Sequence, residues 1–571
     1  MTDWTNEQIN VFDASGNVLV YASAGSGKTS VMVKKIVDDV VKGVPVKDIL
    51  VVSYTKASAT DMRLKIINAL FDVAKDENVK NVDKIREEID NLPFAEIGTM
   101  DSFLGRLIKE NFEYLKISPK AQQMDETESK DMKRRALKKV MNDEYEKQAE
   151  DFIRVASRAS GIVDDTPLSE IVLRIYDAIS INPRPDEFKA MLLSSVTDNP
   201  DSVYGKVILD FYRDLAAETL PFARRAIDVT SLEGAPVYAA ALGHSVETLE
   251  KLSDMQNSDD AKKIIERYVK PNFRGGKPKI SDEDKVLVAT ARDKTAEIIE
   301  NLSEKLFVDY TNYNVDDAKE FMRVVMRVVE EFDREYERLK KRENKIDFAD
   351  LSKYAVKLLK DESRREEIRQ KFSLVFVDEY QDINPLQEEI LLKITDGNLF
   401  MVGDVKQSIY AFRNADSKIF TDKKYLFEQD ESDGKALPMT RNFRSDRELL
   451  RFFDRVFSAV MSTARGGCDY KKESLFLKDD FSDDFGGKAA FMVCENVRTD
   501  EERETKGVYS VKNHVSALSG EEKNGYAEGL AIAAKIKELI GSRYVKKDGS
   551  PLLYSDIAIL FKKRKSGAEG L

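Results

Sequence analysis

The chain has 571 residues, with 91 Lys and Arg against 103 Asp and Glu, which gives a formal net charge of −12. At roughly 100 to 200 residues per domain, this length predicts several domains and excludes a single small binding module. An acidic total excludes an overall coat of positive charge, but it is compatible with a local groove for nucleic acid.

The cysteine content and the apolar runs indicate the cellular setting. Cys468 and Cys494 are too few for a disulfide framework and are not spaced as a CxxC pair, which favours a reducing compartment. The N-terminus lacks the basic and apolar regions of a signal peptide, and apolar runs such as 374–377 fall far below the ~20 residues that cross a bilayer. We therefore expect a cytoplasmic protein with no membrane partner.

Short apolar runs alternate with helical periodicity over the first hundred residues. Strands are predicted at 17–22, 49–54 and 96–100, with amphipathic helices at 31–41 and 57–74 between them. Strands this apolar, separated by helices, are typical of a buried parallel sheet. The predicted fold class is α/β.

The pattern changes after the third strand. Residues 112–340 contain long charged amphipathic helices, such as 129–150 and 315–341, and predict a separate helical unit. Apolar runs return at 374–378 and 399–404, and each of them ends in an acidic residue. Because these runs match the earlier strands, we expect the helical unit to be an insertion into the sheet domain.

A second α/β stretch is predicted in the last part of the chain. It comprises helices at 445–461 and 527–540 and strands at 489–494 and 556–561. We expect this second domain to be incomplete at the end of the chain.

The first strand runs into a glycine-rich loop that fits the phosphate-loop pattern G-x-x-x-x-G-K-[ST], with alanine in place of the first glycine. The residues expected to hold the nucleotide are Ala22, Ser23, Ala24, Gly25, Ser26, Gly27, Lys28 and Thr29. Gly25 and Gly27 let backbone N–H groups turn toward phosphates. Lys28 adds a positive charge at the β and γ oxygens, and Thr29 offers a hydroxyl to Mg²⁺. The alternative is an ordinary glycine-rich turn between a strand and a helix.

An acidic pair follows the apolar run 374–377. Asp378 suits Mg²⁺ binding through water, and Glu379 suits a base that orients the attacking water. Such a pair is often only a solvated loop or a helix cap, but its combination with a phosphate loop favours a nucleotide site. Because 349 residues separate Thr29 from Asp378, the ATPase core must be interrupted by an inserted unit.

Six further blocks, at 4–8, 53–57, 98–103, 347–351, 403–413 and 441–445, occur in the order found in one family. With the phosphate loop and the acidic pair, they make the chain resemble the superfamily 1 DNA helicases of the UvrD/Rep/RecB type. Within that family it is most similar to the AddA subunits of AddAB helicase-nucleases. The resemblance implies ATP and Mg²⁺ as cofactors.

The resemblance also implies roles for single residues. Gln8 would read adenine, Gln407 would sense the γ-phosphate and Arg444 would contact it. Lys28, Glu379, Gln407 and Arg444 are therefore the expected catalytic set. The candidates for DNA binding are Tyr54, Thr55, Thr99, Phe103, Tyr410, Phe412 and Arg413.

Aromatic rings suit single-stranded DNA, because any base can stack on a ring face. The alternative for each aromatic residue is packing in the core. For Tyr54 and Phe103, core packing is about as strong an interpretation as stacking on DNA. It is weaker for Tyr410 and Phe412, which lie in a polar loop.

The implied organisation is a discontinuous RecA-like ATPase domain over 1–111 and 341–425, a helical insertion over 112–340, and a partial second RecA-like domain over 426–571. No block resembles the later helicase motifs or a RecB-type nuclease motif, so we expect the N-terminal part of a longer protein. Two positions depart from the family pattern. Lys56 replaces a usual Asn and Asp101 a usual His, and neither residue is among the DNA-binding candidates.

The function implied by the resemblance is 3′-to-5′ translocation on single-stranded DNA by the helicase part of an AddAB-type enzyme in double-strand break repair and recombination. The expected partners are single-stranded and duplex DNA and an AddB-like protein, and the expected location is the nucleoid. The alternatives are a stand-alone UvrD/PcrA-like repair helicase and an ATP-binding DNA scaffold with little turnover. A basic cluster between Lys262 and Lys279 is either a patch for duplex DNA or a solvated helix face.

Overall fold

The computed structural model describes residues 4–76, 81–160, 165–197, 199, 201–232, 236–271, 281–307, 315–429, 432–445, 447–461, 468, 470, 520–542, 546 and 549–560. The chain forms two compact units. The first contains Met1–Arg444 and Val456–Lys478, and the second contains Ser445–Arg455 and Asp479–Leu571. No helix of the described residues is both long and apolar enough to cross a membrane.

The first unit is built on a six-stranded sheet with the order β3-β2-β6-β7-β1-β8, in which every neighbouring pair is parallel. The strands are β1 (Asn17–Ala22), β2 (Ile49–Ser53), β3 (Glu96–Thr99), β6 (Leu374–Val377), β7 (Leu399–Gly403) and β8 (Gly434–Met439). Because all six are parallel, their carboxyl ends meet at one edge of the sheet, which is where ligands bind in such folds. The predicted α/β fold with a parallel sheet is confirmed.

Strand β8 lies beyond the domain boundary expected at residue 425, yet it pairs with β1 along its whole length, from Asn17↔Gly434 to Ala22↔Met439. It therefore belongs to the first sheet. Pro438 weakens the strand signal in the sequence, since proline cannot donate to a ladder. It is tolerated here because β8 is an edge strand.

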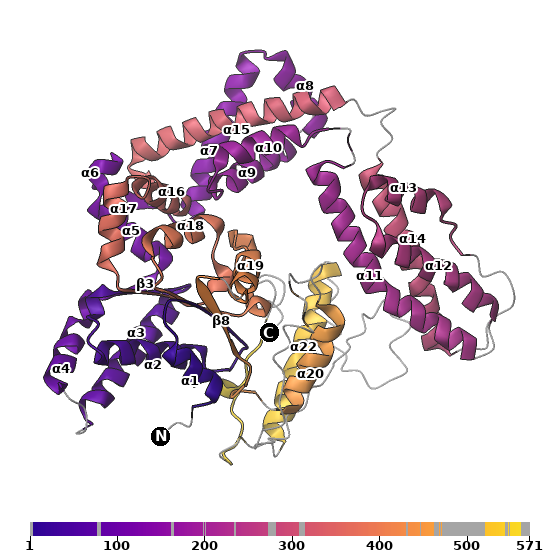
Figure 1. Cartoon of the computed structure of the whole chain (residues 1–571). Helices are drawn as coiled ribbons and strands as arrows, with labels where there is room; N and C mark the ends of the chain where they lie inside the picture. Colours follow the sequence, from indigo (N-terminus) through magenta and orange to yellow (C-terminus); the bar gives the residue numbers. More distant parts are fainter. Residues whose placement is uncertain are drawn as a thin grey trace. The chain divides into compact units, whose positions relative to one another are not determined.

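Helices cover both faces of the sheet (Figure 1). Four of them pack on one face, namely α1 (Asn6–Asp13), α2 (Lys28–Val41), α3 (Lys56–Ala74) and α4 (Val82–Asn91). The other face is covered by α5 (Met100–Glu110), α16 (Phe348–Leu358), α17 (Glu362–Lys371), α18 (Pro385–Ile394) and α19 (Ser417–Phe427). Val18 and Val20 enter one core and Leu19 the other. Burial on both faces explains why the strand sequences are continuously apolar.

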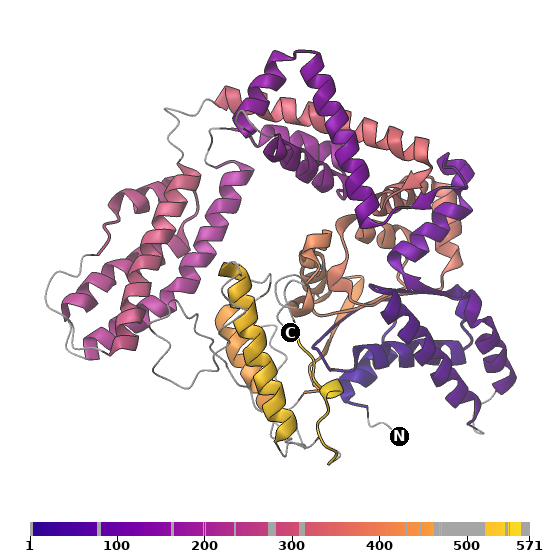
Figure 2. The same cartoon turned by 180° about the vertical axis from the view of Figure 1, so that it is seen from behind.

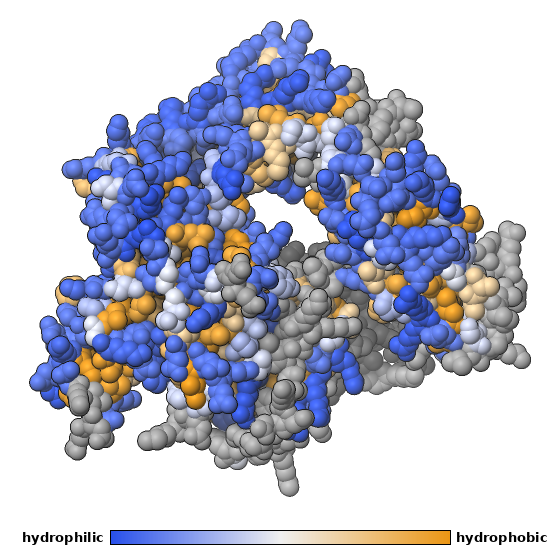
Figure 3. Space-filling view, viewed as in Figure 1, coloured by the Kyte–Doolittle hydropathy of each residue, from blue (hydrophilic) through white to orange (hydrophobic). Residues whose placement is uncertain are grey.

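The helical segment between β3 and β6 contains two separate apolar clusters. One joins α7 (Glu126–Glu146), α8 (Glu150–Ser160), α9 (Thr166–Ser180), α10 (Pro185–Ser194) and α15 (Val315–Glu343) around Phe332 and Tyr336. The other joins α11 (Val203–Leu232), α12 (Pro236–Asp254), α13 (Ser258–Arg267) and α14 (Asp282–Leu306) (Figure 2). In Figure 3 the surface over α8 and α15 is mostly hydrophilic, as the charged sequence there predicts.

Short elements complete the first unit. They are α6 (Phe112–Leu115), the parallel pair β4 (Gln122–Gln123) and β5 (Lys345–Ile346), and the 3-10 turns η1 (Val46–Asp48), η2 (Leu92–Phe94), η3 (Tyr380–Asp382), η4 (Val405–Gln407) and η5 (Ala411–Arg413). Three of these turns, η3, η4 and η5, follow β6 and β7 and carry several of the candidate site residues.

The later helices are α20 (Arg447–Val460), which has residues in both units, and α22 (Gly520–Gly541). They match the helices predicted at 445–461 and 527–540. The strand predicted at 489–494 lies outside the described residues. The strand predicted at 556–561 is wrong over the residues described, because Tyr554–Asp556 is a 3-10 turn, η8, and 557–560 have no regular structure. Leu560 is 95% exposed, and the described part of the chain offers no strand to pair with it.

Candidate nucleotide and DNA site

The loop from Ala22 to Gly27 connects β1 to α2 at the carboxyl edge of the sheet. Gly25 and Gly27 have φ of 74° and 88°, left-handed values that side chains disfavour. Ser26 closes the turn by donating its hydroxyl to the Ser23 carbonyl at 2.8 Å. Helix α2 starts at Lys28 without a side-chain cap. The N–H groups of its first turn, which includes Thr29, are therefore available to an anion.

Lys28 carries a buried positive charge without a matching hydrogen bond. Its Nζ has no hydrogen-bond partner in the structure, and the nearest carboxylate oxygen, on Glu379, lies 3.7 Å away. A buried ammonium without hydrogen bonds is unfavourable. Phosphate oxygens bound in the loop would supply the missing acceptors, so the residues present fit a nucleotide phosphate.

The acidic pair lies directly after β6, beside the phosphate loop. Asp378 is 8% exposed, and its N–H donates to the Val52 carbonyl at 2.8 Å. Burial, reinforced by the charge of Glu379, raises the pKa of Asp378 to about 6. A buried carboxylate of this kind favours a neighbouring cation, and carboxylate oxygens are ligands that Mg²⁺ accepts. Asp378 and Thr29 are therefore the residues suited to hold a magnesium ion.

A buried amide, Gln381, connects the acidic pair to the end of β7. Its Nε2 donates to the Glu379 carboxylate at 2.8 Å, and its Oε1 accepts from the Asp404 N–H at 2.9 Å. The Asp404 carboxylate in turn accepts from Gln407 Nε2 at 2.7 Å. A chain of hydrogen bonds thus runs from Glu379 to Gln407, the residue expected to sense the γ-phosphate.

Residues 440–444, which we call the arginine loop, follow β8 and pack on the phosphate loop. Asn442 Nδ2 donates to the Ala24 carbonyl at 2.6 Å, and the Phe443 N–H donates to the Gly25 carbonyl at 2.8 Å. A Cβ on Gly25 would lie 2.7 Å from the Cβ of Arg444. The arginine loop and the phosphate loop are therefore in van der Waals contact, with Arg444 at the junction.

Gln8, on α1, contacts the phosphate loop. It is 5% exposed, and its Nε2 donates to the Ser26 carbonyl at 3.3 Å. Its Oε1 accepts from the Thr5 N–H at 3.0 Å, which completes a capping box at the start of the helix. The side chain expected to read adenine is thus held against the phosphate loop.

Three of the DNA-binding candidates form an aromatic and cationic cluster beyond η4. The rings of Tyr410 and Phe412 have centroids 5.8 Å apart, and the guanidinium of Arg413 lies 5.8 Å and 5.9 Å from them. Tyr54, after β2, stacks on Tyr410 with centroids 4.0 Å apart. A hydrogen bond with Tyr54 raises the pKa of Arg413 above its usual value. Phe412 is 77% exposed, and the Arg413 side chain is 53% exposed and pairs with Glu126 at 3.3 Å. This cluster therefore offers a ring face to solvent, with a partly exposed guanidinium beside it.

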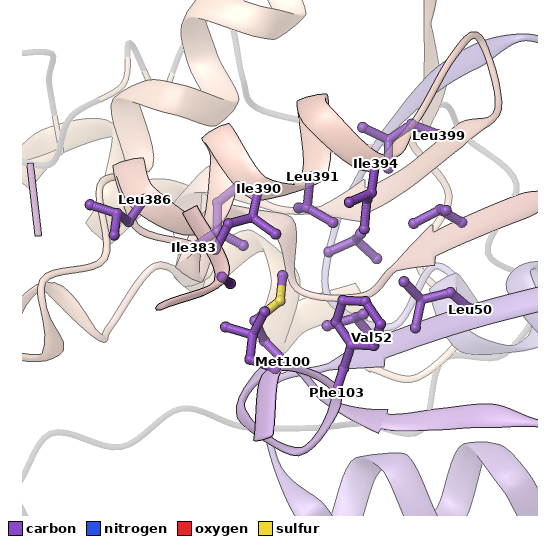
Figure 4. Packing of buried hydrophobic residues seen from close by; sticks show 14 of the residues in the cluster. Leu50, Val52, Met100, Phe103, Ile383, Leu386, Ile390, Leu391, Ile394 and Leu399 are labelled. Carbon is purple, nitrogen blue, oxygen red and sulfur yellow. The ribbon is translucent and has the colours of Figure 1, made fainter. Parts of the chain in front are cut away.

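The other DNA-binding candidates serve the fold. Thr55 and Thr99 are the N-caps of α3 and α5, and accept from the N–H groups of Ser58 and Ser102 at 3.1 Å each. Phe103 is 4% exposed and packs edge-on against Phe372. Figure 4 shows it beside Val52 and Met100 in the core. Its ring has no free face for a base, which corrects the expectation that it stacks on DNA.

The departures from the family pattern lie near the same cluster. Burial raises the pKa of Asp101, while the charges of Arg413 and Lys56 lower it. Lys56 itself is exposed in the first turn of α3. The two residues therefore form part of the electrostatic surroundings of Arg413.

The sequence predicted no role for Gln381, Asn442 or Phe443, although Asn442 and Phe443 lie in the block 441–445 and Gln381 follows the acidic pair by two residues. Phe443 is 53% exposed beside the phosphate loop, and the guanidinium of Arg441 lies 5.4 Å from the centre of its ring. The signal for Asn442 and Phe443 was their position immediately before Arg444.

The basic cluster is only partly described. Lys270 pairs with Asp293 at 3.2 Å, and Lys263 lies 4.0 Å from Asp260. Arg274, Lys277 and Lys279 lie outside the described residues. Two of its positive charges therefore have acidic neighbours within the helical segment.

A parallel sheet with a phosphate loop after one strand and an acidic pair after another defines a phosphate-loop nucleoside triphosphatase. Comparison with known families narrows this class. Residues 4–428 match the UvrD/REP helicase N-terminal domain, and the chain belongs to that family.

Curated relatives match nearly the whole chain. It is 28% identical to the A-type subunit of the ATP-dependent helicase/nuclease of Alkaliphilus metalliredigens, over 100% of this chain and 48% of that protein. The proteins of the same name from Pediococcus pentosaceus and Acetivibrio thermocellus are 28% and 29% identical, over 99% and 100% of this chain and 47% and 50% of their own lengths. The similarity to AddA-type subunits is confirmed. The chain spans about half the length of these relatives.

Proposed function

We propose that the chain is the helicase part of an ATP-driven motor that moves 3′ to 5′ along single-stranded DNA. The observation that carries this proposal is the buried Lys28 ammonium, which has no hydrogen-bond partner among the described residues and lies 3.7 Å from Glu379. An unsatisfied cation beside an acidic pair is suited to nucleotide phosphates. The aromatic cluster follows the same edge of the sheet, which supports a motor rather than a simple ATPase.

The proposed chemistry is attack of water on the γ-phosphate. Bound Mg²⁺ would neutralise charge on the phosphate oxygens, and Thr29 and Asp378 are the residues suited to hold it. Lys28 binds the β and γ oxygens, and Glu379 orients the water and accepts its proton. Arg444 stabilises charge that develops on the phosphoryl group.

Coupling to DNA is proposed to run through the hydrogen-bonded chain from Glu379 to Gln407. η4 ends at Gln407, and Tyr410 follows three residues later. A shift of Gln407 on hydrolysis would therefore move the ring that contacts a base. Phe412 and Arg413 complete the contact by stacking and by charge.

The wider role rests on the relatives, whose name describes one component of a helicase/nuclease. We propose that this chain takes part in double-strand break repair and recombination, with an AddB-like partner, in the cytoplasm at the nucleoid. We also propose that the chain contains a discontinuous RecA-like domain, which is interrupted by the helical segment and extends through β8. Part of a second such domain follows it.

Strand separation on tailed duplexes tests the direction of movement. The whole natural protein should unwind a duplex with a 3′ single-stranded tail in the presence of Mg·ATP, and leave a 5′-tailed duplex intact. The Lys28→Ala variant is the control for contaminating helicases. Unwinding only from the 5′ tail would contradict the proposed polarity, and no ATP-dependent unwinding of either duplex would favour a scaffold.

A further inference from the structure

A carboxylate on α1 holds the start of the arginine loop. Both oxygens of Glu7 accept from Thr440, one from its N–H and one from its hydroxyl, each at 2.7 Å. Thr440 is the first residue after β8, and Glu7 lies in the first turn of α1. Two short bonds from one side chain fix both the backbone and the side chain of Thr440.

The same helix also holds the phosphate loop. Gln8, the next residue, donates to the Ser26 carbonyl at 3.3 Å. Its own orientation is fixed by the capping box with Thr5. Adjacent side chains of one helix thus contact the two loops that meet at the nucleotide phosphates, so the distance between those loops depends on how α1 is seated.

The path from Thr440 to Arg444 is short and hydrogen-bonded. Asn442 Oδ1 accepts from the Arg444 N–H at 2.8 Å, while the Nδ2 of the same amide donates to the Ala24 carbonyl at 2.6 Å. The backbone of Arg444 is therefore determined at two points, by Asn442 in the middle of the loop and by Glu7 at its start.

We propose that Glu7 and Thr440 form a latch that positions Arg444 for phosphoryl transfer. Glu7 touches no reacting atom in this scheme, so it is a positioning residue that acts through the loop. The proposal rests on the proposed function, since it assigns Glu7 and Thr440 to the same ATP site. It also implies that a displacement of α1 would move Gln8, which contacts the phosphate loop, together with Glu7, which holds the arginine loop.

The variants separate a latch from a general effect on folding. Glu7→Ala removes both acceptors and frees the arginine loop. Glu7→Gln keeps two hydrogen bonds to Thr440, because the amide oxygen accepts from the Thr440 N–H and the amide nitrogen donates to the Thr440 hydroxyl oxygen. Thr440→Val removes only the hydroxyl bond. Asn6→Ala is the matched control, since Asn6 is exposed in the same turn of α1.

The measurement is steady-state ATP hydrolysis with single-stranded DNA, together with equilibrium binding of ATP. Misplacing a catalytic group by about 1 Å can cost about 10²-fold in rate, so Glu7→Ala should lower kcat by up to about that factor. ATP affinity should remain within about twofold, because the phosphate loop and Gln8 are unchanged. Thr440→Val should show a smaller loss, while Glu7→Gln and Asn6→Ala should resemble the wild type.

The double variant Glu7→Ala with Arg444→Ala tests whether Glu7 acts through Arg444. If Glu7 acts through Arg444, adding Glu7→Ala to Arg444→Ala should lower kcat no further. Additive losses, or a wild-type rate in Glu7→Ala, would overturn the latch while leaving the ATPase assignment intact. An Arg444→Ala variant with full activity would overturn the latch and the role of Arg444 together. A wild-type protein without ATP hydrolysis would overturn the proposed function itself, and the latch with it. If Glu7→Ala does not fold, the same comparison applies to Thr440→Val with Arg444→Ala.

Discussion

The rings of Tyr54 and Tyr410 stack with centroids 4.0 Å apart and planes inclined by 28°. Tyr54 follows β2 and Tyr410 follows η4, so the stack joins the two loops that carry most of the DNA-binding candidates. Burial raises the pKa of Tyr54, while its hydrogen bond with Arg413 lowers it. The stack thus lies beside Phe412, whose ring is 77% exposed.

Replacing Phe412 with alanine should weaken single-stranded DNA binding by about 1–3 kcal/mol, the usual value of a base stacked on an aromatic ring. The measurement is fluorescence anisotropy with a labelled oligonucleotide. The matched control is Phe94→Ala, because Phe94 is 76% exposed but lies in η2, before β3. A lower Tm with unchanged DNA affinity for Phe412→Ala would instead make this ring part of the core.

Replacing Lys28 with alanine should abolish ATP hydrolysis, because it removes the only charge in the first turn of α2. Phosphate release at saturating Mg·ATP measures the loss. Lys34→Ala is the control on the same helix, since Lys34 pairs with Asp38 outside the loop. Hydrolysis at the wild-type rate in Lys28→Ala would contradict the assignment of the phosphate loop.

Gly25 and Gly16 form a matched pair for testing the contact between the two loops. Both have positive φ, of 74° and 86°, but a Cβ at Gly25 meets Arg444 and Asn442 while one at Gly16 meets nothing within 4 Å. Alanine at either position costs about 1–2 kcal/mol of backbone strain. Only Gly25→Ala should also displace the arginine loop and lower kcat, by about 10²-fold. Equal kcat values for the two variants would show that the contact has no part in hydrolysis.

The sequence predicted the sheet well where local pattern determines burial. The runs 17–22 and 49–54 are apolar on both faces, and they form β1 and β2 with at most one residue of difference. The sequence-based prediction of strands failed where a strand depends on a pairing partner that is remote in the sequence. The apolar run after 556 looks like a strand, but no described neighbour pairs with it. Conversely, Pro438 weakens the sequence signal of β8, which forms because it pairs with β1.

The site was predicted unevenly for the same reason. Motif spacing located Lys28, Asp378 and Glu379, whose chemistry depends on short stretches of chain. The sequence made core packing a stronger alternative for Phe103 than for Phe412 but did not decide it, because only the packing of α5 against the sheet buries Phe103. The contact between Glu7 and Thr440 joins residues 433 positions apart, and no local pattern contains it.

A buried ion cluster between α15 and α16 gives a pH prediction. Lys340, 2% exposed, lies 2.6 Å from Asp350 and 3.9 Å from Asp347. Burial, with the charge of Asp347, raises the pKa of Asp350 to about 6. Because this lies above the unfolded value of about 3.9, the native protein binds a proton between about pH 6 and 4 that the unfolded chain does not. Asp350 therefore contributes more stability as the pH falls.

The free energy of unfolding of the wild type, relative to Asp350→Asn, should accordingly rise as the pH falls from 7 to 5, with a limiting slope of about 1.4 kcal/mol per pH unit. Urea denaturation followed by the fluorescence of Trp4, the one tryptophan of the chain, measures this difference. The asparagine variant cancels the titration of groups that Asp350 does not influence, so the difference reports the carboxyl pair of Asp347 and Asp350. A difference that shrinks on acidification would mean that Lys340 holds Asp350 ionised.

Steady-state phosphate release with and without a single-stranded oligonucleotide tests most directly whether one edge of the sheet couples ATP hydrolysis to single-stranded DNA. We expect DNA to stimulate hydrolysis by the wild type. Glu379→Gln, which keeps size but removes the base, should bind ATP normally and lose about 10²–10⁴-fold in rate, with or without DNA. Hydrolysis that DNA does not change, or a Glu379→Gln variant that hydrolyses ATP like the wild type, would contradict this coupling.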